Sequence, residues 1–159
     1  MSKKLNKWDK RFLRIAYEVA HWSKDPSHKV GAVAVKEKRI IATGYNGFPT
    51  GVEDIDYRWR TKEIKNQYIV HAEMNCIYNA TNHGVNLTGS TLYVYGLPVC
   101  NECAKGIASA GIKKVVGAAN LEDGIPSRWF ESYKKTVAML DEVGVQLVLT
   151  DTMTLMEEL

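Results

Sequence analysis

The chain of 159 residues is long enough for one domain with a sizeable core, and it contains no linker or internal repeat, so we expect a single domain over residues 1–159. A hydrophobic content of 45% and a charged content of 25% are ordinary for a globular protein, and a net charge of +3 argues against a broad nucleic-acid-binding face while allowing a local basic pocket. No apolar run approaches the roughly 18 residues of a membrane span, and no signal-peptide core opens the chain, which makes the cytoplasm the expected location.

The first third of the chain is predicted to contain a helix, a loop and a hairpin. Apolar residues recur at intervals of three and four over residues 7–22, the pattern of an amphipathic helix. Residues 23–29 include an Asp-Pro pair and indicate a loop, because the residue before a proline disfavours helix. Two β-rich runs, 30–36 and 39–45, are separated by a short polar link, so we expect a hairpin there.

The remainder of the chain alternates between helical and extended patterns after a long connection over residues 46–66, and a connection of that length is usually functional. The predicted elements are a helix over 69–82, a strand over 91–95, a helix from the cysteine loop to 110, a strand over 112–117, a helix over 127–142 and a strand over 145–150. This alternation predicts an α/β domain with helices on both faces of a sheet. The tail after Asp151 is expected to pack on a neighbour or to fray.

His71, Cys100 and Cys103 are candidate ligands of one metal ion. A neutral imidazole and two thiolates suit Zn²⁺, and three protein ligands leave a fourth tetrahedral position open for water, which is typical of a catalytic zinc. If the two cysteines open a helix, their spacing of three places them on one face, and the positive helix end favours their thiolate forms. Glu73 is a hard oxygen donor that is not needed as a ligand, so we interpret it as a proton shuttle.

A closed zinc site that only joins two loops is the structural alternative, and it lacks an evident fourth ligand. Cys76 lies about a helical turn beyond Glu73, and we interpret it as a small buried hydrophobe. Three cysteines with two in a CxxC pair fit metal binding in a reducing compartment better than disulfides. His28 is interpreted as an exposed loop histidine, with contact to a substrate as the alternative.

The His-x-Glu and Pro-flanked CxxC pairing resembles the zinc-dependent nucleoside, nucleotide and nucleobase deaminases. The wider sequence is similar to the deoxycytidylate (dCMP) deaminase family from about Trp8 to Leu149. The motifs that carry this resemblance are Ser23-Lys24-Asp25-Pro26, Lys29-Val30-Gly31-Ala32, Gly44-Tyr45-Asn46-Gly47-Phe48-Pro49 and His71-Ala72-Glu73-Met74-Asn75. One departure is Val99, which separates Pro98 from the first thiolate, whereas the family usually has Cys directly after Pro.

The resemblance implies a three-layer α/β/α cytidine deaminase-like fold with a mixed five-stranded sheet and helices on both faces. It also implies an enzyme with one Zn²⁺ per chain that hydrolyses dCMP to dUMP and ammonia, supplying a precursor of thymidylate. In the implied reaction Glu73 carries a proton to N3 of cytosine while water adds at C4, and then protonates the departing amine.

Residues expected to bind the substrate follow from the same resemblance. Asn46 would contact a sugar hydroxyl or base edge, with a plain Asn-Gly turn as the alternative, and the backbone of Ala72 would read the pyrimidine ring. The loop over residues 23–29 would hold the 5′-phosphate, with Lys24 and Lys29 supplying charge and Ser23 a hydrogen bond. Tyr95 is expected either to stack on the base or to be a half-buried strand residue.

The resemblance further implies a homo-oligomer, with a hexamer favoured, and regulation by dCTP (activating, with Mg²⁺) and dTTP (inhibiting) near the Gly-Tyr-Asn-Gly loop. A deaminase of the same fold that acts on another cytosine or purine base or nucleoside is the nearest alternative function. A non-catalytic zinc protein that senses a nucleotide is an alternative of a different class, and Glu73 argues against it because a sensor does not need a proton shuttle.

Overall fold

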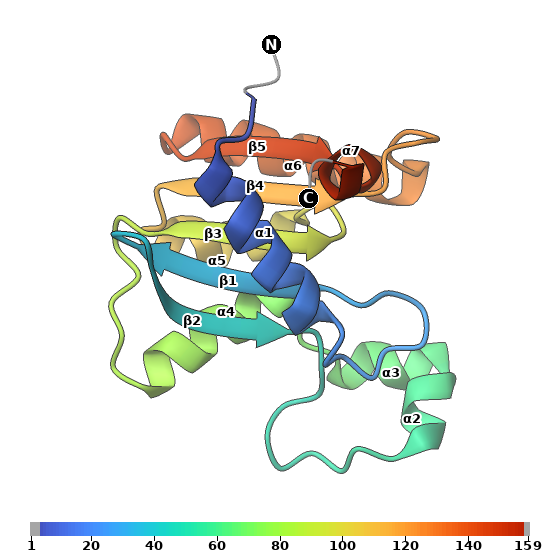
Figure 1. Ribbon diagram of the computed structural model, residues 1–159. Coiled ribbons are helices and arrows are strands. Elements are labelled where there is room, and N and C mark those ends of the chain that lie inside the picture. The colour runs from blue at the N-terminus through green and yellow to red at the C-terminus, as the bar shows by residue number, and fades with distance from the viewer. Residues whose placement is uncertain (1–3, 158–159) are drawn as a thin grey trace.

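A five-stranded sheet of order β2-β1-β3-β4-β5 forms the centre of the computed structural model, which describes residues 4–157 (Figure 1). Helices cover both faces of this sheet, which confirms the predicted three-layer α/β/α architecture. The elements are α1 (Lys7–Ala20), β1 (Gly31–Lys36), β2 (Arg39–Tyr45), α2 (Asp56–Arg60), α3 (Lys62–Tyr68), α4 (Ala72–Asn82), β3 (Thr91–Gly96), α5 (Asn101–Ser109), β4 (Lys114–Ala119), α6 (Ser127–Glu142), β5 (Gln146–Asp151) and α7 (Thr152–Glu157).

The sheet is mixed, as expected. Strand β1 is antiparallel to both β2 and β3, whereas β3, β4 and β5 run parallel to one another. Glu37 and Lys38 connect β1 to β2 with positive φ angles of 52° and 62°, the left-handed conformation that a two-residue hairpin turn needs to match the strand twist. Because the three parallel strands end at the same edge, the loops that follow β3 and β4 converge there.

Alternation of side chains along the strands divides the core between the two faces. Val33, Tyr93 and Val116 pack with α1 and α7 on one face. Ala32 and Val94, their neighbours in sequence, pack with α4 and α5 on the other. Helix α1 fits the predicted amphipathic pattern and begins at a capping box, in which the Asn6 side chain accepts hydrogen bonds from the backbone N–H groups of the first turn.

Two regions differ from the predicted elements. Helix α4 begins at Ala72, three residues later than predicted, because Val70 is extended and pairs with Gly47 through backbone hydrogen bonds of 2.8 and 3.1 Å. The long connection contains the short helices α2 and α3, which have too few turns to show a clear apolar period in sequence. The C-terminal tail packs on the sheet through buried Leu155 of α7.

None of the helices within residues 4–157 has the length and apolar character needed to cross a bilayer.

Candidate active site

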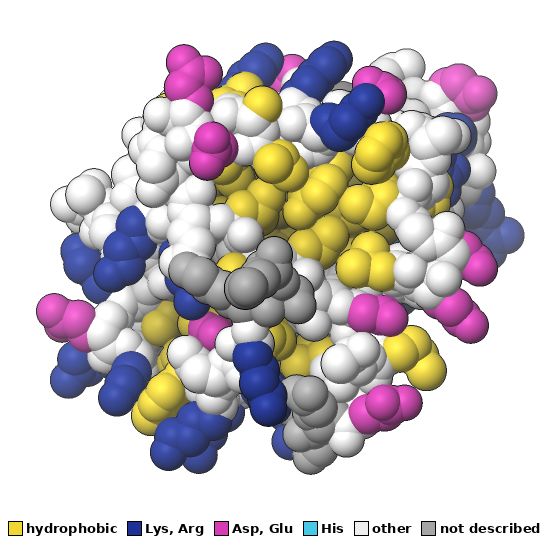
Figure 2. Space-filling model, turned by 90° about the horizontal axis from the view of Figure 1, so that it is seen from above, with side chains coloured by type: hydrophobic (Ala, Val, Ile, Leu, Met, Phe, Trp, Pro, Cys, Tyr) yellow, Lys and Arg dark blue, Asp and Glu magenta, His cyan; other side chains and the backbone are white. Residues whose placement is uncertain are grey.

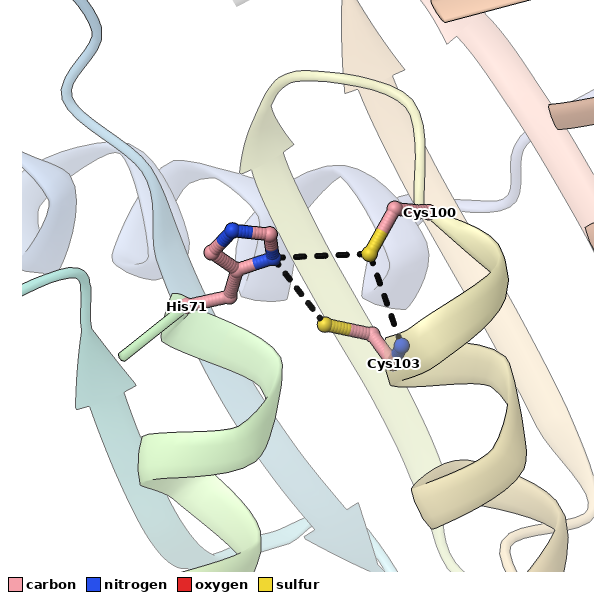
Figure 3. Close-up of side chains that lie close together, drawn as sticks. All are labelled: His71, Cys100 and Cys103. Carbon is pink, nitrogen blue, oxygen red and sulfur yellow. Dashed lines mark hydrogen bonds between the residues drawn. The ribbon is translucent and has the colours of Figure 1, made fainter. Parts of the chain in front are cut away.

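His71, Cys100 and Cys103 come together although 29 residues separate the first two (Figure 3). His71 precedes α4 as its N-cap, and Cys100 is the N-cap of α5, so both helices begin at the cluster. The His71 Nδ1 atom lies 3.4 Å from each sulfur, and all three ligand atoms lie within 4.8 Å of one another. The proximity predicted for these residues is therefore present, and their role as metal ligands remains a prediction.

The separations fit a tetrahedral zinc ion. Zinc bonds of about 2.3 Å to sulfur and about 2.0 Å to nitrogen, at a tetrahedral angle, place the two ligand atoms roughly 3.5 Å apart. The 3.4 Å distances between Nδ1 and each sulfur match that value. A borderline imidazole and two soft sulfurs also form the donor set that zinc prefers over magnesium or calcium.

Local charge favours an ionised thiol at this position. The pKa of Cys100 is lowered to about 4, chiefly by the hydrogen bond with Cys103 and also by the nearby imidazole. The pKa of His71 is raised, first by its hydrogen bond to Cys100. Cys103 is 1% exposed, and the hydrogen bond with Cys100 together with burial raises its pKa, so in this arrangement Cys100 carries the negative charge.

Glu73 is a buried carboxyl group beside the cluster. It lies in the first turn of α4 and is 4% exposed, and the Cys103 thiol donates to its Oε2 atom over 3.6 Å. Burial raises the pKa of Glu73, because removal of water disfavours the charged form. A raised pKa makes the carboxylate a better proton acceptor than a solvent-exposed glutamate, which suits a proton shuttle.

The cluster and Glu73 open into a cavity of about 600 Å³. This is large enough for a nucleotide-sized ligand. Residues from α2, α3, the loop before β1 and the start of α6 complete the walls. Those that carry charge, an amide or an aromatic ring include Asp25, His28, Asn46, Trp59, Arg60, Lys62, Lys65, Arg128 and Trp129.

Asn46 and Ala72 line this cavity, as predicted. The Asn46 amide is already engaged within the chain, since Oδ1 accepts from Val30 N at 2.9 Å and Nδ2 donates to His28 O at 2.7 Å and to Asp25 Oδ2 at 3.3 Å. These hydrogen bonds of the Asn46 amide stabilise the loop before β1. Only the second lone pair of Oδ1 is left to accept a hydrogen bond from a ligand. Ala72 is fully buried at the start of α4.

Ser23, Lys24 and Lys29 do not reach the cavity. Lys24 forms an exposed ion pair with Asp54 at 2.6 Å, and Lys29 donates a hydrogen bond to the Ser23 carbonyl. All three residues border a separate cavity of about 530 Å³. The loop turns where the Asp25 carboxylate accepts backbone hydrogen bonds, and its lysines line the second cavity, which shares Pro26, Trp59 and Arg60 with the first. This placement corrects the prediction that these three residues bind the phosphate.

Tyr95 also lies away from the cavity. Its ring packs edge-on against Tyr17 of α1, with the ring centres 4.9 Å apart, on the sheet face opposite α4 and α5. The period of two along β3 places Tyr95 with Tyr93 and sends Leu92 and Val94 toward the α4 face. Tyr95 is thus a half-buried strand residue, the second of its two predicted roles, and this placement contradicts the first, stacking on the base.

Sequence reasoning missed cavity residues that come from remote segments. Arg128 and Trp129 lie at the start of α6, where the Arg128 guanidinium stacks over the Trp129 ring at 4.1 Å, and the His28 ring meets Trp129 edge-on at 5.0 Å. The only available signal was that they follow the carboxyl end of a predicted strand. Lys65 of α3 also lines the cavity, and its short helix shows no clear apolar period in sequence.

Comparisons with known proteins agree with this geometry. Residues 6–119 match the family described as the cytidine and deoxycytidylate deaminase zinc-binding region. An uncharacterized deaminase in the luxG 3′ region of Aliivibrio fischeri is 40% identical over 143 residues, covering 90% of this chain and 93% of that protein. The probable deoxycytidylate deaminase of Drosophila melanogaster is 38% identical, covering 87% and 70% of the two chains. Human deoxycytidylate deaminase is 41% identical, covering 69% and 63%.

Solved structures show the same fold. The dCMP deaminase of cyanophage S-TIM5, crystallised with dCMP and dUMP, superimposes with a TM-score of 0.73 at 24% identity, covering 93% of this chain and all of that one.

Proposed function

The chain belongs to the family defined by the cytidine and deoxycytidylate deaminase zinc-binding region, and on that premise we propose that it hydrolyses dCMP to dUMP and ammonia. The observation that carries this proposal is a His/Cys/Cys cluster that opens, beside buried Glu73, into a cavity of nucleotide size. The proposed role is to supply a thymidylate precursor, and the proposed location is the cytoplasm.

His71, Cys100 and Cys103 would hold one Zn²⁺ per chain. When bound, zinc acidifies a water molecule in its open coordination position, to a pKa of about 7 in well-studied hydrolases. Glu73 accepts a proton from the attacking water and delivers it to N3 of cytosine as the new C4–O bond forms. It then carries the second water proton to the amino group, so that ammonia leaves and the C4 carbonyl of uracil remains.

The buried start of α4 suits pyrimidine recognition. Backbone N–H groups in the first turn of a helix have no partner within the helix, so those near Ala72 can donate to a carbonyl oxygen of the base. The second lone pair of Asn46 Oδ1 is available to a sugar hydroxyl.

We assign the 5′-phosphate to Arg128 in place of Lys24 and Lys29. Arg128 lines the cavity, and its stacking on Trp129 restricts the guanidinium plane, which leaves its N–H donors free to meet an anion with paired hydrogen bonds. Two of the other three wall cations have carboxylate partners: Arg60 pairs with Asp56 at 2.8 Å, and Lys65 pairs with Asp25 at 3.2 Å. The third is Lys62, and Arg128 is distinguished from it by the stacking on Trp129 that orients its guanidinium.

A substrate comparison combined with one substitution tests the proposal. Ammonia release should be fast from dCMP and much slower from deoxycytidine, cytosine and guanine. The Glu73→Gln variant should keep zinc, measured by elemental analysis, and lose roughly 10²–10⁴-fold in turnover, the usual contribution of a general acid–base group. An active Glu73→Gln variant would overturn the shuttle, and equal rates for dCMP and a purine base would overturn the substrate assignment.

Regulation by dCTP with Mg²⁺ and by dTTP is proposed from the family alone. The separate cavity bordered by Lys24 and Lys29 offers cations outside the catalytic cavity. Addition of dCTP and Mg²⁺ should convert a sigmoidal dependence of rate on dCMP into a hyperbola, and a curve that is hyperbolic without dCTP and unchanged by it would remove this proposal.

Self-association is proposed through the edge formed by α6 and β5, with a second copy of this chain as the partner. Figure 2 views this edge of the molecule and shows a broad apolar area. Phe130, Val137 and Val143 of this region are 43–55% exposed.

Sedimentation of two charge variants tests the surface. Val137→Glu should lower the oligomer mass, whereas Ile40→Glu on β2, at a site of matched exposure (44% against 43%), should leave it unchanged. A monomeric wild-type protein, or dissociation by the Ile40 variant alone, would contradict this assignment.

A further inference from the structure

A buried carboxylate organises one wall of the cavity that His71 and Cys100 also line. Asp25 is 5% exposed, and its Oδ1 accepts hydrogen bonds from Ser27 N at 2.8 Å and His28 N at 3.3 Å. Its Oδ2 accepts from Asn46 Nδ2 at 3.3 Å. Asp25 therefore fixes both the backbone at His28 and the amide of Asn46, two groups that line the cavity.

The countercharge of Asp25 comes from a distant segment. Lys65 of α3 lies 40 residues further along the chain, and its ammonium group is 3.2 Å from each carboxylate oxygen. The side chains of Lys65 and Asp25 are 13% and 6% exposed, so solvent screens this pair little. A second ion pair, Lys24 with Asp54, also joins the loop around Asp25 to residues 47–70. Its side chains are 64% and 39% exposed, so it contributes less to stability than the buried pair.

Lys65 belongs to residues 47–70, here called the α2–α3 segment, which forms the opposite wall of the cavity. The backbone pairing of Gly47 with Val70 closes its ends, and Phe48 stacks on Trp59 within it at 4.1 Å. Neither contact reaches the loop that carries Asp25. Of the two ion pairs between this segment and that loop, Lys65 with Asp25 is thus the buried one.

We propose that Lys65 is a positioning residue, whose ion pair with Asp25 holds the α2–α3 segment against the loop of residues 25–30 and so completes the substrate cavity. This rests on the proposed function for its kinetic readout. Lys65 acts through Asp25 and does not touch the phosphate, so its loss affects a nucleotide and its nucleoside by the same factor.

The test is a double-mutant cycle of Lys65→Met and Asp25→Asn, read by kcat and KM with dCMP and with deoxycytidine. Each single variant leaves one buried group without its partner and should lower kcat/KM about tenfold for both substrates. The double variant should lie closer to wild type than the product of the two single losses. Lys105→Met is the matched control, because its ion pair with Glu102 is exposed, and it should behave as wild type.

Chymotrypsin digestion supplies a readout that is independent of catalysis. Cleavage within the α2–α3 segment, which contains Tyr57 and Tyr68, should be faster in Lys65→Met than in wild type or Lys105→Met. A kinetic loss confined to dCMP would overturn the proposal, because it would mean direct phosphate contact. Additive single losses or an unchanged cleavage rate would also overturn it. A wild-type protein inactive on dCMP would refute the proposed function, and the digestion would still test the ion pair.

Discussion

Substitution of Gly44 by alanine should displace the helix that carries the catalytic carboxyl group. A Cβ atom at Gly44 would lie 2.2 Å from Cys76 N and 2.7 Å from Ala72 O, which are both backbone atoms of α4. Ordinary contact begins at 3.4 Å, so the helix must retreat by about 1 Å from β2. Glu73 lies in that first turn and would move with it.

The expected cost has a structural and a catalytic part. Overpacking typically costs about 1–3 kcal/mol, which for a chain of this size lowers Tm by roughly 2–12 °C. A misplacement of about 1 Å between catalytic group and substrate can lower kcat by about 10²-fold. Differential scanning calorimetry and ammonia release from dCMP, each with parallel zinc analysis, measure the two parts.

Gly47 provides a matched control within the same Gly-Tyr-Asn-Gly motif. The atom nearest to a Cβ at Gly47 is a Tyr45 ring carbon at 3.7 Å, an ordinary contact, and its φ angle is not positive. Gly47→Ala should therefore keep the wild-type Tm and kcat. A Gly44→Ala protein with wild-type stability and turnover, or equal damage by both substitutions, would refute the argument from close packing.

Three further predictions concern other parts of the molecule. Burial, and after it the nearby Arg128 charge, lowers the pKa of His28 from 6.5, so the native state loses stability as the pH falls below 6.5. His28→Gln should therefore flatten the decline of Tm between pH 7 and pH 5. An unaltered slope of Tm against pH would contradict this. Cys103→Ala should lose both zinc and turnover, and elemental analysis that finds full zinc would remove this cysteine from the ligand set. Tyr93→Phe removes the 2.9 Å hydrogen bond to buried Asp9 and should lower the unfolding free energy by about 1–3 kcal/mol with kcat unchanged, whereas a lost kcat at wild-type stability would show that the α1 face takes part in catalysis.

The candidate metal cluster was predictable because metal-binding chemistry depends on which residue types are present and on their spacing. A histidine two residues before a glutamate and two cysteines three apart form a donor set that few other functions require, so their meeting follows without knowledge of the path between them. The main strands and helices were predictable for a similar reason, since their apolar periods are long enough to count. Helices α2 and α3 were not, because five and seven residues provide too few turns.

The residues that face the substrate could not be predicted, because the direction in which a side chain points depends on the turns and strand register of the folded chain. Lys24 and Lys29 lie in the predicted loop, yet a turn stabilised by Asp25 points them into another cavity. Tyr95 shares a strand with core residues, and its place in the period of two sends it to the α1 face.

By itself the sequence determined the α/β class, the donor set and the shuttle candidate, because periodicity and ligand chemistry are local properties of the chain. Only the tertiary structure decided that Arg128, Trp129 and Lys65 share the cavity with His71. The wall is assembled from segments as remote in sequence as Asp25 and Trp129, and their relative placement depends on how the whole core packs.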